Sequence, residues 1–294
     1  MPSLKEIKGR IGSVQSTLKI TFAMKLVASA KLRRAQQAIE GMRPYERKLQ
    51  EMLGNLLASG ATVSGPYAQT APRTDEDGVQ EKPRVAIVAF ASNSSLCGAF
   101  NANVLRLTLD ALRECGETEV TVHSVGRKMA DAMRKCDRPS PADYHKLADK
   151  PSYAEASALA EQLMEDFREG RLDRVELIYN HFVSSGKQVP VREVLLPTGS
   201  VIPSGAKEPE RDYILEPSAS ELLEDLLPKS LKLKFYTALL DSNASEHAAR
   251  TVAMQTATDN GEDLLQELTL QYNKSRQQKI TSEILDLAGG SQEQ

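Results

Sequence analysis

The sequence is poor in large aromatic side chains, and it contains no tryptophan. Aromatic residues make up 5% of the 294 positions, whereas hydrophobic residues make up 40% and charged residues 26%. The last two proportions are ordinary for a globular protein. A compact enzyme usually draws more of the buried area of its core and pocket from aromatic side chains. The composition is typical instead of long helices, which use Ala, Glu, Lys, Leu, Arg and Gln, the residues that dominate both ends of this chain.

Cysteines are also few, and no two of them have the spacing of a metal site. Cys97, Cys115 and Cys136 form no CxxC motif, and their number is odd. This pattern indicates a reducing compartment and free thiols rather than a disulfide framework. We expect no metal site and no bound cofactor.

Long apolar runs are missing as well. No run reaches the roughly 18 residues that a membrane-spanning helix needs. The first residues, MPSLKEIKGR, have neither the apolar stretch of a secretory signal nor the composition of a transit peptide, which favours a bacterial source. We therefore expect no direct insertion into lipid, and any association with a membrane would go through partner proteins.

Charge is distributed unevenly along the chain. Residues 1–50 carry eleven basic and three acidic side chains, whereas residues 216–294 carry seven basic and thirteen acidic ones. Such an asymmetry is typical of a nucleic-acid-binding arm or of two elements that pair with each other. A nucleic-acid surface would need interleaved aromatic residues, and Phe22 and Tyr45 are the only ones near the basic residues. We expect no nucleic-acid partner.

Residues 1–58 have the spacing of a coiled-coil helix, with a capping box at Ser3 and Glu6. Thr21 and Lys25 place polar side chains at two seam positions. Pro44 is expected to end or kink the helix before the seam resumes. The seam consists of two sets of residues with heptad spacing and a later leucine set: Ile11, Leu18, Lys25, Leu32 and Ile39; Ile7, Val14, Thr21, Ala28, Ala35 and Met42; Leu49, Leu53 and Leu56.

A Gly-, Pro- and Ser-rich linker over 59–83 separates this helix from a segment with a different pattern. Over 84–197, short apolar runs alternate with helical stretches, which predicts an inserted Rossmann-like α/β domain with a largely parallel sheet. Strands are expected over 85–90, 119–125, 174–182 and 189–197, the last two joined as a hairpin, with helices over about 100–115, 126–136 and 153–170.

The last part of the chain predicts a second long helix. Residues 198–228 are expected to form a connecting loop and a short helix (218–227) that ends before Pro228, and residues 229–294 the long helix. A single helix over 229–288 would be about 90 Å long at ~1.5 Å per residue, so it must lie against a long partner. The fold class is therefore α/β plus a long antiparallel coiled coil, in which the two terminal helices form a rod.

Three segments resemble one family, the gamma chain of rotary F-type ATP synthases. Lys19–Ala28 resembles the core of its first helix, and residues 92–101 (SNSSLCGAFN) its turn after the first strand. Residues 245–290 resemble its second helix, including the pattern Ile280-Thr281-x-Glu283-x-x-Asp286 and Gly290. The chain departs from the family at Asn93-Ser94-Ser95, where an acidic-basic-Gly sequence is usual, and at Ser291, where Ala is usual.

The resemblance implies a central rotor shaft (central stalk) without an active site of its own, which couples proton transport through a membrane ring to conformational cycling of catalytic subunits during ATP synthesis. The implied partners are the alpha and beta subunits of the catalytic head, the small epsilon (and delta-type) subunits and the proton-carrying c-ring. The implied location is that of a peripheral membrane protein on the cytoplasmic side of the bacterial inner membrane.

The resemblance also implies which side chains meet partners, although solvated helix faces and a surface loop are the alternatives from the residues alone. Contacts with the catalytic ring are implied for Met24, Lys25, Lys31, Arg33, Arg34, Arg250, Arg276, Gln277 and Thr281, and contacts with the membrane ring or epsilon chain for Tyr213 and Glu216. Cys97 and His247 are expected to be structural, because no base or second ligand stands at a suitable spacing.

Two other functions fit the same architecture. The inserted domain could be an enzyme that the coiled coil merely dimerises, or the chain could be a tether between two complexes. ATP turnover by the purified chain would favour the enzyme, and none is expected from a shaft.

Overall fold

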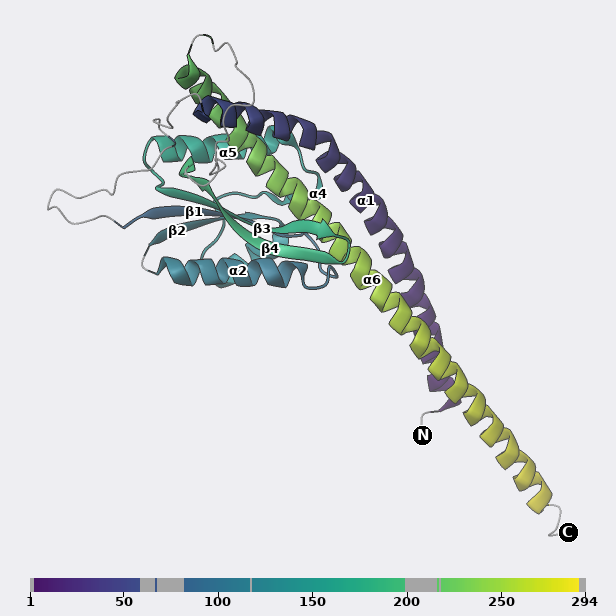
Figure 1. The fold of residues 1–294 in the computed structure, drawn as a ribbon. Coiled ribbons are helices and arrows are strands. Elements are labelled where there is room, and N and C mark those ends of the chain that lie inside the picture. The colour runs from purple at the N-terminus through teal and green to yellow at the C-terminus, as the bar shows by residue number, and fades with distance from the viewer. Residues whose placement is uncertain are drawn as a thin grey trace. The chain divides into compact units, whose positions relative to one another are not determined.

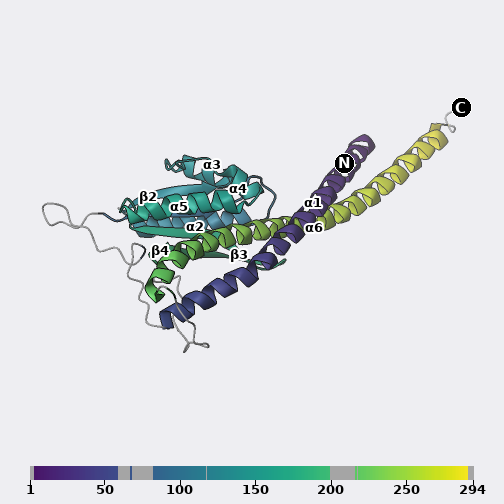
Figure 2. The same ribbon diagram turned by 90° about the horizontal axis from the view of Figure 1, so that it is seen from above.

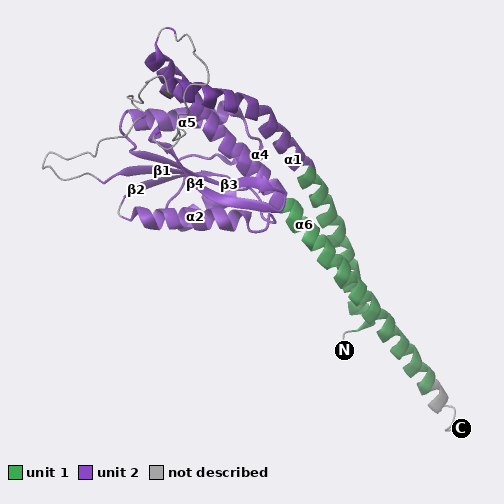
Figure 3. Ribbon diagram, in the orientation of Figure 1, with its two compact units in different colours: residues 1–29, 250–294 green, residues 30–249 purple. Residues whose placement is uncertain are grey.

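The computed structural model describes residues 3–58, 67, 82–116, 118–198, 216 and 218–290. The chain divides into two compact units (Figure 3): residues 1–29 with 250–294 form unit 1, and residues 30–249 form unit 2. Two long helices, α1 (Leu4–Ala58) and α6 (Ala219–Gly290), contribute to both units. Each unit is described separately below.

Unit 1 is an antiparallel helix pair. The Thr21 hydroxyl of α1 and the Thr258 hydroxyl of α6 are hydrogen-bonded at 3.0 Å, and Leu18 lies against Gly261. A step toward the N-terminus of α1 is thus a step toward the C-terminus of α6, as Figures 1 and 2 show for this pair. Gly261 permits the close approach, because a Cβ there would lie 2.7 Å from Leu18 Cδ2. The polar seam position at Thr21 is therefore satisfied across the pair.

The same two helices also pair within unit 2. Leu32 and Ala35 of α1 form one apolar cluster with Ala244 and Ala248 of α6. A second cluster joins leucines from the C-terminal part of α1 to leucines from the N-terminal part of α6: Leu49, Leu53, Leu56, Leu223 and Leu233. The predicted antiparallel pairing of the terminal helices is confirmed in each unit, and so is the capping box, since Glu6 N donates to Ser3 Oγ at 3.2 Å.

The predicted end of a short helix before Pro228 is wrong, and of the two outcomes expected at Pro44, an end or a kink, the end does not occur. The helix α1 continues through Pro44, and α6 runs from Ala219 through Pro228 without a break. Proline removes one helical hydrogen bond, but Pro44 lies on the exposed side of α1, where water can solvate the freed carbonyl. Apolar packing on both sides of each proline then holds the helix together. A second capping box starts α6, because Glu221 N donates to Ser218 Oγ.

Four strands form the sheet of unit 2, in the order β2-β1-β3-β4. They are β1 (Arg84–Phe90), β2 (Glu119–Val125), β3 (Arg174–Ser184) and β4 (Lys187–Leu196). Strand β1 runs parallel to β2 and β3, whereas β4 is the antiparallel partner of β3 in a hairpin. The prediction of a largely parallel sheet with a terminal hairpin is confirmed.

Helices cover both faces of this sheet (Figures 1 and 2). They are α2 (Phe100–Cys115), α3 (Arg127–Lys135), α4 (His145–Asp149) and α5 (Tyr153–Arg168). Alternate residues of β1 point to opposite faces, as a strand requires. Ile87 packs with α2 and α3, whereas Val88 packs with α4, α5 and α6.

The helix α6 supplies part of the core of the α/β unit. Leu227, Leu231 and Phe235 are buried in the same cluster as the β1 and β3 side chains. The Phe235 ring meets the Phe90 ring edge to face, with centroids 5.6 Å apart. Residues 84–197 therefore share their core with α6. The predicted division of the chain into separate domains at residues 83 and 197 stays a prediction.

Truncation of this shared core should destabilise the α/β unit. Phe235→Ala removes a fully buried ring, which typically lowers the free energy of unfolding by about 3–5 kcal/mol. Chemical denaturation of the full chain, followed by circular dichroism, measures the change. Leu270→Ala, at a side chain that is 65% exposed, is the control and should have little effect. Equal midpoints for the two variants would show that α6 does not complete the core.

Candidate functional site

The C-terminal part of α6 in unit 1 is an exposed helix face. Every residue from 276 to 285 is exposed, and Ile280, Ile284 and Leu285 are 44%, 60% and 64% exposed. Moving leucine and isoleucine side chains out of water lowers the free energy, so a contiguous exposed set of them favours an interaction surface. Arg276, Gln277 and Thr281 lie on the same exposed stretch.

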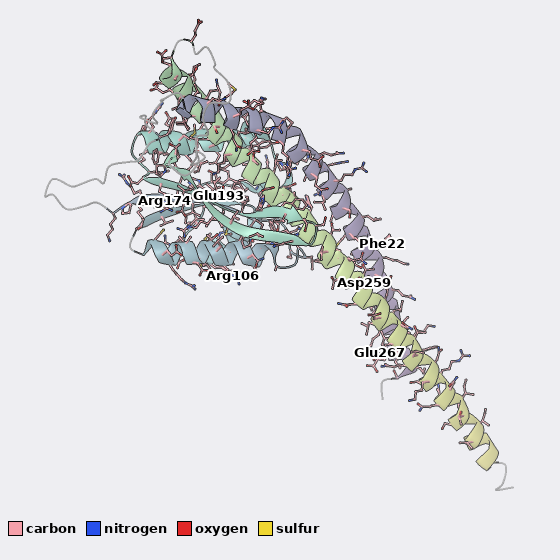
Figure 4. All side chains as sticks on the ribbon, viewed as in Figure 1. Phe22, Arg106, Arg174, Glu193, Asp259 and Glu267 are labelled. Carbon is pink, nitrogen blue, oxygen red and sulfur yellow. The ribbon has the colours of Figure 1, made fainter. Side chains whose placement is uncertain are left out.

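The first half of α1 in unit 1 presents a second apolar surface, which lies off the seam. Ile20, Leu26 and Val27 are each more than half exposed. Phe22 is half exposed, and the Lys25 ammonium lies 5.7 Å from its ring centroid, within the range of a cation–π contact. Figure 4 labels Phe22 on α1 and Asp259 on α6 in this unit. The sequence prediction included Met24 and Lys25, which are half-buried, but it missed the exposed apolar residues, although Ile20 and Val27 have heptad spacing of their own.

The other predicted contact residues have different surroundings. Lys31, Arg33 and Arg34 are exposed on α1 in unit 2. Arg250, expected near a helix surface, is instead buried in unit 1, with 8% exposure. Glu216 is exposed, and Tyr213 lies outside the described residues.

The carboxyl edge of the sheet is the usual ligand site of an open α/β fold, and here α6 occupies it. Leu239, Asn243 and Glu246 of α6 lie against Phe90 and Val125, the last residues of β1 and β2. The cavity left between them measures about 10 Å³, which is room for one water molecule at most. This crevice cannot hold a nucleotide.

The Ser-rich turn after β1 is held together by internal hydrogen bonds. Asn101 donates to Ser92 Oγ at 2.8 Å, and Asn93 donates to the His145 carbonyl at 2.7 Å. The Cys97 thiol is buried within this network. Burial lowers the pKa of His123, and the Nδ1 atom of its ring lies 3.4 Å from the Tyr144 hydroxyl. The turn thus has the structural arrangement expected of it, and His247 is buried on α6.

A charged cavity of about 440 Å³ in unit 2 was not predicted. It interrupts the apolar seam between α1 and α6, and strands β3 and β4 form its remaining wall. Lys234 Nζ pairs with Glu193 at 3.3 Å, and His181 pairs with Asp241. The charged groups in its wall are Arg43, Glu46, His181, Glu193, Lys234 and Asp241.

Burial controls the ionisation of the carboxyls in this cavity. It raises the pKa of Glu46, and the negative charge of Asp241 raises it further. Burial also raises the pKa of Asp241, although the hydrogen bond from His181 opposes this change. The pKa of Tyr179 is raised in the same way by burial and by nearby carboxylates. No local sequence pattern predicts this cavity, because its residues come from three distant segments.

The described part of the chain has neither a cluster of metal ligands nor a helix suited to a membrane. No group of three or more His, Cys, Asp or Glu side chains there could hold a metal ion. No helix in that part is both long and apolar enough to cross a bilayer.

Comparison with known sequences gives full-length relatives. A family model described as ATP synthase matches residues 3–292. The ATP synthase gamma chain of Bacteroides fragilis is 54% identical over 299 residues, and that of Phocaeicola vulgatus is 52% identical over 296 residues. Each alignment covers 99% of both chains.

Solved structures share the fold. A chain in the rotor of the Euglena gracilis mitochondrial ATP synthase matches with a TM-score of 0.62 and 21% identity, covering 94% of this chain and 98% of that one. A chain in the central stalk and c-ring of the Tetrahymena thermophila mitochondrial enzyme matches with a TM-score of 0.55 and 25% identity, covering 81% and 99%.

Removal of the Glu46 charge should change the pH dependence of stability. A raised pKa means that the folded state holds the proton more tightly, so stability falls as the pH rises from the ordinary value of 4.5 through the raised one. Glu46→Gln abolishes this loss, and its melting temperature at pH 7 should exceed that of the unaltered chain. Below about pH 4 the two should agree, because the carboxyl is then neutral in both states.

Thermal unfolding of the full chain across this pH range is the measurement. Glu40→Gln, at an exposed position of the same helix, is the control and should leave the melting temperature nearly unchanged. A Glu46→Gln chain that is less stable at pH 7 would contradict the assignment of the raised pKa.

Proposed function

The chain belongs to the family of ATP synthase gamma chains, and we propose from this premise that it turns as the central shaft of a bacterial F-type ATP synthase. In this role it couples proton flow through a membrane ring to conformational cycling of the catalytic subunits. A gamma chain is a structural rotor subunit and is not itself catalytic. The full-length identity of 54% to a curated gamma chain is the observation that carries the proposal.

The exposed end of α6 supports contact with a catalytic head. Ile280, Ile284 and Leu285 have no apolar cover within the described part of unit 1, and a surrounding ring of subunits would remove them from water. Arg276, Gln277 and Thr281 would then lie where the shaft meets that ring. We assign the ring to alternating alpha and beta subunits.

The exposed surfaces of α1 fit the same role. Lys31, Arg33 and Arg34 would face an acidic loop of the catalytic subunits, and Met24 and Lys25 would lie beside the sliding surface. Exposed ion pairs each contribute only about 0–1 kcal/mol, so a shaft can pass from one catalytic subunit to the next without being trapped. Such weak contacts would let the shaft rotate against the ring. Arg250 is buried within the chain, so a direct partner contact there would require its side chain to move.

At the other end, Tyr213 and Glu216 would face the c-ring and the small epsilon (and delta-type) subunits. The chain would then be a peripheral membrane protein on the cytoplasmic side of the bacterial inner membrane, held there by these partners. A solved neighbour in the central stalk and c-ring of the Tetrahymena thermophila enzyme supports an assembly of this kind.

A drive mechanism follows from the asymmetry of such a shaft. Each catalytic subunit would meet a different face of α1 and α6 at each angle of rotation. Differential binding of those faces to alternative subunit conformations is what shifts the conformations in turn. The shaft would transmit this free energy without touching the nucleotide. The filled crevice at the sheet edge agrees with that role and disfavours an enzyme that uses the inserted domain.

Cross-linking of the α6 tip tests the proposal. In a chain with Cys115→Ser and Cys136→Ser, an Ile284→Cys thiol should form a disulfide, when an oxidant is added, with a cysteine introduced on the facing surface of a head subunit in the assembled complex. That bond should stop ATP hydrolysis until it is reduced, because the shaft can no longer turn. Glu224→Cys, at an exposed position of α6 in unit 2, is the matched control and should not bond to the same head site. An Ile284→Cys thiol that stays open to bulk reagents in the complete complex would contradict the proposal.

A further inference from the structure

A two-turn segment of α6 in unit 2, residues 241–248, is buried on all sides. Every residue in it is less than one-tenth exposed, and six of the eight have polar side chains that are not needed for an apolar core. On an α-helix, residues two apart point in roughly opposite directions, whereas residues four apart share a face. The polar side chains of residues 241–248 therefore contact different neighbouring elements.

Two of these side chains donate hydrogen bonds to backbone carbonyls that have no donor in their own helix or sheet. Asn243 Nδ2 donates to the Ala148 carbonyl at 2.9 Å. Ala148 lies in the last turn of α4, a five-residue helix, where carbonyls have no helical donor. A buried carbonyl without a partner is costly, so this bond fixes α4 on α6.

The second carbonyl belongs to Asn180 of β3. Ser245 Oγ donates to it at 2.8 Å. On the β4 side Asn180 is opposite Pro190, which has no N–H, and on the β1 side strand pairing ends at Ile178. The Asn180 carbonyl therefore has no donor in either neighbouring strand, and Ser245 supplies one.

The remaining contacts of residues 241–248 join α6 to β3 and to α1. Asp241, four residues before Ser245 and on the same face, pairs with His181 of β3. Ala244 and Ala248 pack against Leu32 and Ala35 of α1. Alanine presents a smooth surface, and apolar contact has no preferred direction. Hydrogen bonds, in contrast, weaken steeply when their angle changes.

We infer that Asn243 and Ser245 are torque keys, which lock the inserted α/β domain to α6 against rotation about the helix axis and sliding along it. The inference rests on the proposed rotor function. With the two bonds in place, the inserted domain turns with the helix as one body. Without them, the domain is held on α6 by apolar packing and by side-chain ion pairs (His181–Asp241, Lys234–Glu193 and Lys232–Glu161), and it follows the helix less stiffly.

Angular fluctuations of a bead on the reconstituted head complex measure this stiffness. Cys136 is an exposed native thiol on the inserted domain and accepts one bead, with Cys115→Ser preventing a second attachment. Lys48→Cys in a Cys115→Ser, Cys136→Ser chain accepts a bead on α1, where the side chain is 61% exposed. The two attachments report on the domain and on the helices separately.

In an Asn243→Ala, Ser245→Ala chain, the angular variance of the Cys136 bead should rise by about twofold, because directional bonds are lost. The variance of the Lys48→Cys bead should not change. Thr237→Val is the matched control, since the Thr237 hydroxyl binds only the Leu233 carbonyl of its own helix, and both beads should behave as in the unaltered chain. If the double variant does not assemble, Ser245→Ala alone, which deletes one oxygen, decides by the same comparison.

Two results would overturn the inference: unchanged variance at Cys136, or an equal rise at both beads, which would indicate general softening rather than a lost key. Failure of the unaltered chain to rotate would instead contradict the proposed function, and the inference with it.

Discussion

Neither terminal helix of this chain can bury its apolar stripe without the other. In unit 1 the close approach of Leu18 to Gly261 and the Thr21–Thr258 hydrogen bond set the register of the pair. In unit 2 leucine and alanine clusters continue the pairing. Because most of the stability of a helix in a protein comes from the packing of its apolar face, the seam is what keeps both of them ordered. The exposed surfaces that we assign to partner contact are the parts of the helices that the seam does not use.

The inserted domain depends on the same seam through α6. That helix contributes Phe235 to the core, closes the carboxyl edge of the sheet and satisfies two leftover carbonyls. The sheet edge where this kind of fold commonly binds nucleotides is thereby used to attach the inserted domain to α6. The charged cavity beside it shows that the seam tolerates ionisable groups where a strand hairpin widens the gap between the helices.

Sequence periodicity was sufficient to predict the helix pairing, the largely parallel sheet and the hairpin, because burial on one face leaves a repeat that can be read locally. It failed at Pro228, and the helix end that it allowed at Pro44 does not occur, because tertiary packing outweighs the local penalty at both prolines. It also missed the short helix α4. The contact residues came from a family resemblance, which gives positions but not burial, so Arg250 was expected near the surface. The polar cavity and the keys at Asn243 and Ser245 could not be predicted, because each depends on segments that are distant in sequence.

The central claim is that the two ends of the chain move together as one shaft. A disulfide between Thr21→Cys and Thr258→Cys, whose native hydroxyls lie 3.0 Å apart, would join them covalently. ATP synthesis driven by a proton gradient, measured in vesicles that contain the complete complex, should be the same with this disulfide oxidised or reduced. Loss of synthesis on oxidation, with recovery on reduction, would show that the two helices must move past each other and would contradict the claim.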